Sequence, residues 1–219
     1  MQPVVDMSMS NGDMGALSNT GDHSTTDHFT LKCTTEFEDL VHFVYPDLNE
    51  ATHLMHGRAI FATTNTVIDA SNKDIAERRS QHAIPFISWD KLMRDESNPY
   101  AAFAAPEHLD LLNAEGVPPH ELQLRSNDRA MPTRNLNFGE GLVNGQKGVL
   151  LGVSPNSRVI QVQLLTPLYP IVLVPRINFH VQVGRQGVNF SRVQFPLRLA
   201  YSLTINKPQG QTLFASGSI

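Results

Sequence analysis

The residue types best suited to chemistry lie near the end of the sequence, in the polar segment Asn206–Thr212, N-K-P-Q-G-Q-T. An apolar run, Leu199–Ile205, precedes this segment and predicts a buried strand. Proline is favoured at the first position of a helix, so we expect a helix to begin at Pro208. Because helix N-termini direct unpaired N–H groups outward and attract anions, we expect this turn to suit a phosphate at the carboxyl end of the strand.

A second polar segment, A-T-T-N at Ala62–Asn65, follows the short apolar run Ala59–Ala62. The run predicts a buried strand, and the residues from about Val67 to Arg79 predict a helix, which together form a unit of α/β type. Two interpretations of the segment stay open. Asn65 and its neighbours could contact a nucleotide at the carboxyl end of the strand, or they could simply cap the helix.

A third block is rich in glycine and spans Arg134–Gly148, R-N-L-N-F-G-E-G-L-V-N-G-Q-K-G. Its glycines allow tight turns and close backbone approach, and Asn144-Gly145 is a strong hairpin signal. The pattern G-x-x-x-x-G-K-[ST] of a P-loop occurs neither here nor elsewhere in the sequence. A glycine-rich hairpin without any ligand therefore stays an open alternative.

Metal chemistry and nucleophilic catalysis are not indicated by the sequence. His53 and His56 could share a helical face, but no third ligand of suitable spacing accompanies them. Cys33 is the only cysteine, so there is no internal disulfide, and no motif supports it as a nucleophile. We expect neither a metal site nor a catalytic residue.

Charge is divided unevenly along the sequence. Residues 1–119 carry 7 Lys and Arg and 18 Asp and Glu, whereas residues 120–219 carry 10 and 3. The basic second half favours an anionic partner such as nucleic acid, although basic residues on solvated strand faces would give the same count. No apolar run approaches the roughly 18 residues that a membrane-spanning helix needs, so we expect no membrane partner.

The remaining elements follow from hydrophobic spacing. Residues 1–33 contain few large apolar residues, and we expect them to be disordered or loosely packed. Phe37, Leu40, Val41 and Val44 lie at helical spacing. We expect the region from residue 84 to residue 100 to be irregular, with Trp89 as a packing anchor. Candidate strands of an antiparallel sheet or barrel follow at 147–153, 159–165, 171–174 and 178–183.

Five blocks of the sequence resemble, in the same order, segments of superfamily-one DNA helicases of the Pif-one type, including those of Helitron transposons. They are G-V-P-P-H-E-L (116–122), R-N-L-N-F-G-E-G-L-V-N-G-Q-K-G (134–148), V-P-R-I (174–177), Q-F-P-L-R (194–198) and T-I-N-K-P-Q-G-Q-T (204–212). A strand followed by a Thr-Asn pair and a helix also begins the second RecA-like domain of these helicases. The sequence departs from the family at Asn127, usually Gly, at Pro132-Thr133, usually part of an apolar strand, and at Pro208, usually Ser.

The resemblance implies an α/β fold, namely part of a second RecA-like helicase domain with a small antiparallel SH3-like β-barrel inserted in it. On this basis we expect residues 34–145 to form the first part of that domain and residues 146–193 to form the barrel. Residues 194–219 then return to the RecA-like domain, which is cut short.

The resemblance also implies a function, because helicases of this type couple ATP hydrolysis to 5′→3′ movement on single-stranded DNA. The chain would be a fragment of such an enzyme, which acts in the nucleus in DNA repair, recombination or telomere maintenance. Thr64, Arg134, Asn135, Thr204, Asn206 and Lys207 would contact single-stranded DNA, and Asn65, Gln209 and Gly210 would line part of the nucleotide site.

ATP and Mg²⁺ would bind only together with a first motor domain, which supplies the P-loop and the acidic residues that hold magnesium. We therefore expect the isolated chain to be inactive as an ATPase, since it also stops before the family's final arginine motif. The alternative is a non-catalytic nucleic-acid-binding relic of a Helitron helicase. The sequence does not indicate an oligomeric state.

Overall fold

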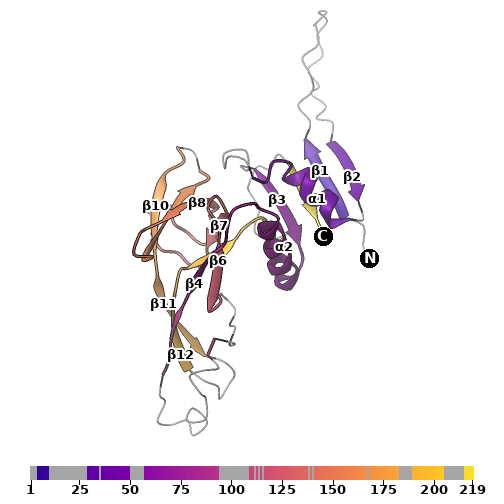
Figure 1. Cartoon of the computed structure of the whole chain (residues 1–219). Coiled ribbons are helices and arrows are strands. Elements are labelled where there is room, and N and C mark those ends of the chain that lie inside the picture. Colours follow the sequence, from indigo (N-terminus) through magenta and orange to yellow (C-terminus); the bar gives the residue numbers. More distant parts are fainter. Residues whose placement is uncertain are drawn as a thin grey trace, which may run out of the picture. The chain divides into compact units, whose positions relative to one another are not determined.

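The computed structural model describes residues 36–49, 57–93, 109–110, 112, 114, 116–137, 139, 141–166, 168–182, 189–204 and 219, and the backbone of strands at 4–9, 29–34 and 215–218. The chain divides into two compact units (Figure 1). The first comprises Met1–Ile75 and Tyr201–Ile219, and the second comprises Ala76–Ala200.

The first unit is built on a five-stranded mixed sheet of order β14-β3-β15-β1-β2. Its strands are β1 (Val4–Met9), β2 (Phe29–Thr34), β3 (Arg58–Ala62), β14 (Ser202–Thr204) and β15 (Ala215–Ser218). Both β14 and β15 run parallel to β3, whereas β1 pairs antiparallel with β15 and β2. The parallel pairing confirms the α/β character that the strand–turn–helix pattern predicts.

Two helices belong to the described part of the chain, α1 (Phe37–Val44) and α2 (Asn65–Glu77). In α1 the residues at helical spacing, Leu40, Val41 and Val44, are buried, and the helix packs against β3 and β15. In α2 the buried residues Ile68, Ser71, Asn72 and Ile75 recur every three or four positions, which defines one inward face. Within the described residues, no helix is both long and apolar enough to cross a membrane.

Strands β1 and β2 lie in the segment that we expected to be disordered or loosely packed. Their antiparallel register pairs Val5 with Cys33 and Met7 with Leu31, and it sets Asp6 opposite Lys32. The register therefore pairs apolar positions with apolar ones and an acidic position with a basic one, which is the pattern that fixes a register. The apolar positions of β1 and β2 form short patterns, which the low overall hydrophobicity of residues 1–33 hides in the sequence.

The described part of the second unit contains three antiparallel sheets. The largest has the order β10-β9-β8-β7-β13, the next has the order β11-β12-β5, and β4 pairs with β6. The strands are β4 (Ile84–Ile87), β5 (Trp89–Leu92), β6 (Glu121–Leu124), β7 (Arg129–Pro132), β8 (Gly148–Val153), β9 (Val159–Leu164), β10 (Ile171–Pro175), β11 (Ile177–Gln182), β12 (Asn189–Gln194) and β13 (Leu197–Leu199). A core that includes Leu124, Leu150, Ile160 and Phe195 fills the space between β4, β6 and the largest sheet.

The closed SH3-like barrel that we expected between residues 146 and 193 is not found in the described residues. The predicted strands near 147–153, 159–165 and 171–174 are present as β8, β9 and β10, but their sheet is open. The strand predicted at 178–183 appears as β11 and belongs to a different sheet, where β12 pairs with β11 on one side and β5 on the other. Both hydrogen-bonding edges of β12 are therefore occupied, so it cannot close a ring with β8–β10.

The prediction of an irregular segment from residue 84 was wrong for its first part, because β4 and β5 occupy it. Trp89 was also misjudged as a packing anchor, since 79% of its surface is exposed. In β4 only Phe86 is buried, and Ile84, Pro85 and Ile87 face solvent. The strand thus lacks the strict alternation of apolar and polar residues that predicts a half-buried strand.

Asn127 explains one departure from the helicase pattern. It adopts a φ of 63°, in the left-handed region that glycine enters without strain. Asparagine is among the few other residues that tolerate this region. The exchange of the family's usual glycine for Asn127 is therefore compatible with the same turn.

Candidate functional site

The carboxyl ends of two parallel strands meet at one edge of the first unit's sheet. The register sets Thr204, the last residue of β14, opposite Ala62, the last residue of β3. Thr64 and Asn65 follow β3 after Thr63 and are exposed, and Thr204 is half-buried. The structure thus brings three of the predicted site residues to the edge where open α/β sheets bind ligands. Their contacts with DNA or nucleotide stay predictions.

Thr64 also caps helix α2. Its side-chain oxygen Oγ1 accepts a hydrogen bond from the backbone N–H of Val67 at 3.4 Å, and its carbonyl accepts one from Ile68 at 3.2 Å. The simpler of the two interpretations, a helix cap, is therefore realised at Thr64. It does not exclude the other, because the exposed N-terminus of α2 carries Asn65 at the same edge.

The strand that leads into the C-terminal polar segment is buried as predicted, but it is shorter than the apolar run. Strand β13 ends at Leu199 in the second unit, and β14 begins at Ser202 in the first. Tyr201, Ser202 and Leu203 are each at most 2% exposed. Asn206, Lys207, Gln209 and Gly210, together with the helix expected at Pro208, lie outside the described residues.

Arg134 and Asn135 are exposed and lie in the second unit. The Arg134 guanidinium stacks over the Phe179 ring at 4.9 Å from its centroid, a cation–π contact. The Asn135 carbonyl Oδ1 accepts a hydrogen bond from the backbone N–H of Asn144 at 2.8 Å, which ties the two ends of the glycine-rich loop together. Both residues thus have structural contacts, and their predicted role on DNA stays a prediction.

Sequence reasoning missed a buried ion pair between Asp90 and Arg192. Arg192 is fully buried and donates from Nη2 to Asp90 Oδ2 at 2.7 Å and from Nε to both carboxylate oxygens at 3.1 Å. It also donates to the carbonyls of Leu109 and Pro118, at 2.8 and 3.2 Å. One guanidinium thus connects β12, β5 and the loop before β6.

Ser88 and His120 complete this cluster. Ser88 Oγ lies 2.6 Å from Asp90 Oδ1 and 2.9 Å from His120 Nδ1, which itself lies 3.2 Å from Asp90 Oδ2. Burial alone would raise the pKa of Asp90, but the bonds from Arg192, Ser88 and His120 outweigh burial and lower it. Serine and carboxylate share one ring nitrogen, so His120 cannot relay a proton as in a nucleophilic triad. The cluster is structural.

Gln194 is a second structural centre formed by the residues that carry the family resemblance. Its buried amide nitrogen donates to the carbonyls of Phe86 at 2.7 Å and His120 at 3.0 Å, and its oxygen accepts the N–H of Phe195 at 2.9 Å. Arg176 donates to the same oxygen at 3.2 Å and stacks over Phe195 at 4.7 Å. The blocks around residues 116–122, 174–177 and 194–198 therefore meet in one place.

Lys147, in the glycine-rich block, is 7% exposed and lies just before β8. Burial, and to a lesser extent the charge of Arg129, lowers the pKa of Lys147 to about 8. Arg129 itself is fully buried at the start of the neighbouring strand β7. The basic balance of residues 120–219 is therefore partly internal, which weakens the argument from charge counting for an anionic partner.

The glycines of this block have packing reasons of their own. A Cβ atom on Gly148 would lie 2.5 Å from Val162 Cγ1 and 3.0 Å from the carbonyl oxygen of Gln163, so β8 and β9 can approach only at a glycine. Gly145 has a φ of +83° and occupies a turn closed by a 3.1 Å bond from the Gln146 N–H to the Val143 carbonyl. The alternative of a glycine-rich segment without a ligand accounts for both positions.

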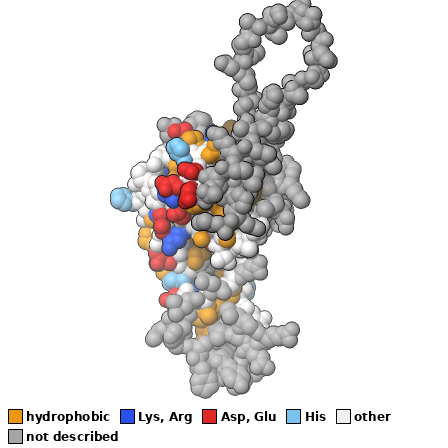
Figure 2. Space-filling model, turned by 90° about the vertical axis from the view of Figure 1, so that its right-hand side faces the viewer, with side chains coloured by type: hydrophobic (Ala, Val, Ile, Leu, Met, Phe, Trp, Pro, Cys, Tyr) orange, Lys and Arg blue, Asp and Glu red, His pale blue; other side chains and the backbone are white. Residues whose placement is uncertain are grey.

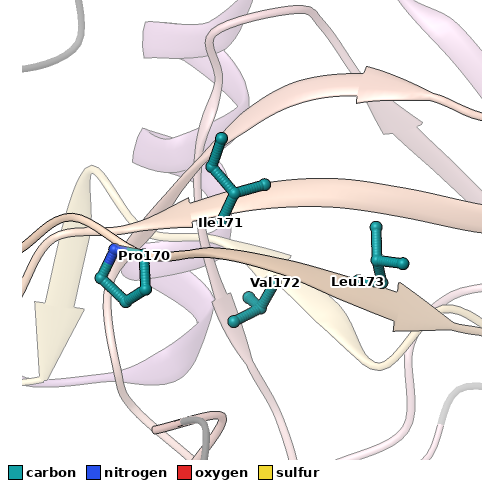
Figure 3. A pocket seen from close by; sticks show the side chains of 4 residues that line it. All are labelled: Pro170, Ile171, Val172 and Leu173. Carbon is teal, nitrogen blue, oxygen red and sulfur yellow. The ribbon is translucent and has the colours of Figure 1, made fainter.

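A shallow cavity of about 350 Å³ lies at the edge strand β10 and is lined by Pro170, Ile171, Val172 and Leu173 (Figure 3). Ile171 and Leu173 project to one side of the strand and Val172 to the other, as the alternation of a strand requires. None of these side chains carries a polar group, so this cavity offers no chemistry.

Acidic side chains gather on the face shown in Figure 2. In the first unit Glu38, Asp39 and Asp69 are exposed, in keeping with the acidic balance of residues 1–119. The described residues contain no group of three His, Cys, Asp or Glu that could hold a metal; His53 and His56 lie outside these residues.

Comparison with known proteins bears on the motifs directly. Residues 107–153 match the family model described as "DNA helicase Pif1, 2B domain". The human ATP-dependent DNA helicase PIF1 is 34% identical over 109 residues, which is 49% of this chain and 16% of that protein. The Xenopus laevis protein of the same name is 32% identical over 120 residues, 54% of this chain and 18% of that protein. This chain is similar to part of a Pif1 helicase.

The matched segment spans less than a fifth of the length of these Pif1 relatives. Among solved structures, the Pif1 helicase from Candida albicans matches with a TM-score of 0.53 and 23% identity, over 82% of this chain and 43% of that one. At this identity the likeness concerns the fold, and it supports the α/β helicase-domain architecture that we predicted.

The Pif1 family model and the domain limits that we predicted divide the chain differently. The model covers 107–153, whereas we expected the inserted module at 146–193. The described residues of the matched stretch include β6, β7 and the first strand of the predicted insert, β8. The limits 1–33, 34–145, 146–193 and 194–219 stay a prediction.

Proposed function

We propose that this chain forms part of an ATP-dependent 5′→3′ DNA helicase, to which it contributes contacts with single-stranded DNA and part of the ATP cleft. The similarity to Pif1 helicases supports the enzyme class. The observation that carries the proposal is the parallel pairing of β3 and β14, which brings Thr64, Asn65 and Thr204 to one sheet edge. The segment Asn206–Thr212 follows directly from that edge.

In this proposal one set of polar residues contacts DNA and another faces the nucleotide. Thr64, Thr204, Asn206 and Lys207 contact the DNA backbone, with Lys207 as its phosphate partner by charge. Asn65, Gln209 and Gly210 face the nucleotide and connect it with the DNA contact. Arg134 and Asn135 would contact DNA from the second unit.

ATP and Mg²⁺ require a first motor domain in this proposal, since the sequence contains no P-loop. We accordingly propose that the isolated chain neither hydrolyses ATP nor unwinds DNA. A magnesium-dependent ATPase that copurifies with the chain through successive columns would refute this part.

Binding of single-stranded DNA provides the main test. The probe is a fluorescently labelled oligothymidine. Its fluorescence anisotropy is measured while the chain is titrated into it at several salt concentrations. We expect binding that weakens as salt rises, and we expect Lys207→Ala to weaken it and to reduce the salt slope by roughly 0.7, the contribution of one phosphate contact. Lys91→Ala, at an exposed lysine of β5, is the matched control. No binding at low salt, or equal binding by both variants, would count against the proposal.

A non-catalytic nucleic-acid-binding relic of a Helitron helicase is the second candidate, favoured by the basic balance of residues 120–219. The sequence of the gene around this chain separates the two. An in-frame P-loop upstream and an arginine motif downstream support the helicase, whereas stop codons on both sides support the relic. For an intact helicase we propose nuclear residence and a role in DNA repair, recombination or telomere maintenance, by analogy with the family that it resembles.

A further inference from the structure

One buried side chain holds the edge strand that leads into the proposed DNA-contacting segment. Asn72, on the inward face of α2, is 3% exposed, and Ser202, the first residue of β14, is fully buried. Asn72 Oδ1 accepts the backbone N–H of Ser202 at 2.8 Å, and Asn72 Nδ2 donates to the Ser202 carbonyl at 3.2 Å. The Asn72 amide therefore satisfies both backbone groups of one strand residue.

This contact has the pattern of a strand neighbour. In a parallel ladder the N–H and C=O of one residue point to the same side and bond a neighbouring strand. Strand β14 is the edge of its sheet, with β3 on one side. Asn72 supplies on the other side the donor and acceptor that a further strand would supply.

A second side chain fixes the residue before it. Tyr45, at the end of α1, donates from its hydroxyl to the Tyr201 carbonyl at 2.7 Å, and the two rings meet edge to face at 5.6 Å. The same carbonyl accepts the N–H of Ile60 from β3 at 3.1 Å. Asn72 of α2 and Tyr45, at the C-terminal end of α1, thus both hold the start of β14, two residues before Thr204.

We infer that Asn72 is a positioning residue that fixes the register of β14 and thereby the place of Thr204 beside Thr64 and Asn65. The consequence for DNA rests on the function proposed above. Asn72 and Asn65 lie two turns apart on the same helix, so α2 links the two strand ends rigidly. A side chain without the amide would leave the N–H and C=O of Ser202 buried and unsatisfied, and β14 could slip or fray.

The test compares Asn72→Ala with Ser71→Ala in the whole chain. Ser71 is its buried neighbour, whose hydroxyl donates to Ile68 within the same helix, so its loss leaves β14 untouched. We measure hydrogen exchange of the Ser202 amide by NMR and the affinity for labelled oligothymidine. We expect Asn72→Ala to speed exchange at Ser202 at least tenfold and to weaken DNA binding at least tenfold, while Ser71→Ala changes neither.

Asn72→Asp tests the second of the two bonds. The aspartate keeps the acceptor for the Ser202 N–H but places a buried carboxylate oxygen against the Ser202 carbonyl, which repels it, so we expect exchange at Ser202 to be faster than in the wild type and the affinity to fall. Exchange at the wild-type rate would show that the bond to the carbonyl does not hold β14. If the variants do not fold, the wild-type chain decides, because the bond predicts a scalar coupling between the Ser202 amide nitrogen and the Asn72 side-chain carbonyl carbon. Absence of this coupling would overturn the inference.

The outcomes distinguish this inference from the function on which it rests. Normal exchange and normal affinity in a folded Asn72→Ala variant would refute the role of Asn72 even if the wild type binds DNA. A wild type that does not bind oligothymidine refutes the proposed function, while exchange at Ser202 in Asn72→Ala still decides whether Asn72 fixes β14.

Discussion

Replacing Gly148 by alanine tests whether the glycines of the helicase-like block serve packing or ligand approach. Gly148 opens β8 and lies against β9, with which it pairs opposite Leu164. An added Cβ would lie 2.5 Å from Val162 Cγ1, 3.0 Å from the Gln163 carbonyl oxygen and 3.5 Å from Leu164 Cδ2. The first distance is well inside van der Waals contact, and the second is tighter than an ordinary contact.

The magnitude follows from what would have to move. Val162 is 1% exposed, its β-branched side chain is stiff at χ1, and the Gln163 oxygen is backbone. Neither neighbour can rotate away, so the two strands must separate locally. Overpacking of this kind lowers the free energy of unfolding by roughly 1–3 kcal/mol, and we expect the upper half of that range.

Gly152 is the matched control because it lies in the same strand and a Cβ there would meet nothing within 4 Å. Its φ is not positive, so Gly152→Ala should be neutral or stabilise by up to about 1 kcal/mol through the unfolded state. Urea unfolding followed by circular dichroism gives both values. Equal stability of the two variants would refute the packing argument, and a loss of DNA binding by Gly148→Ala at unchanged stability would point to ligand approach instead.

Three further predictions concern buried and exposed side chains of the second unit. The pKa of Lys147 is lowered to about 8 in the folded protein, so between pH 8 and 10 the unfolded state binds more protons than the folded state. The free energy of unfolding should therefore rise by roughly 2–3 kcal/mol over this range. Lys147→Met should abolish the rise, which urea unfolding at each pH measures. Asp90→Ala leaves the Arg192 guanidinium buried without its carboxylate and should cost roughly 3–5 kcal/mol, against at most about 0.5 kcal/mol for exposed Lys91→Ala, both measured by urea unfolding. Trp89, the sole tryptophan, should emit as a water-exposed indole whose spectrum shifts little on unfolding, and a blue-shifted native spectrum would contradict its exposure.

Local patterns predicted the elements that position the candidate site. The apolar run Ala59–Ala62 lies in β3, the helix predicted from about Val67 to Arg79 is α2, and part of the apolar run Leu199–Ile205 forms β14. Each of these signals, an apolar run or a helical spacing, belongs to one continuous segment. The same holds for β8, β9 and β10, whose apolar runs are bounded by glycine, proline and serine.

What the sequence could not predict is partnership between distant strands. The single pattern of β12 does not reveal that β5, about a hundred residues earlier, occupies its second edge, and the barrel prediction failed there. Nor does the spacing of polar residues reveal that Arg192 pairs with Asp90 or that Asn72 bonds Ser202. Such contacts depend on tertiary placement. The one local signal for them is a polar residue at a position of the inward helix face, as at Asn72.

The motif residues of the second unit are engaged in structural contacts, and this bears on what their similarity to helicases means. Three motif residues of the second unit serve structure, because their hydrogen bonds join β4, the loop before β6 and the corner between β12 and β13. They are His120, Arg176 and Gln194. A fourth, Gly148, lets β8 and β9 approach each other. Their side chains are occupied within the protein. At the edge of the first unit Thr64 and Asn65 are in contrast exposed, although the Thr64 hydroxyl oxygen also caps α2. Similarity in the second unit therefore argues for a shared architecture, and the decisive evidence for activity must come from the first, where β14 leads into the lysine-bearing segment.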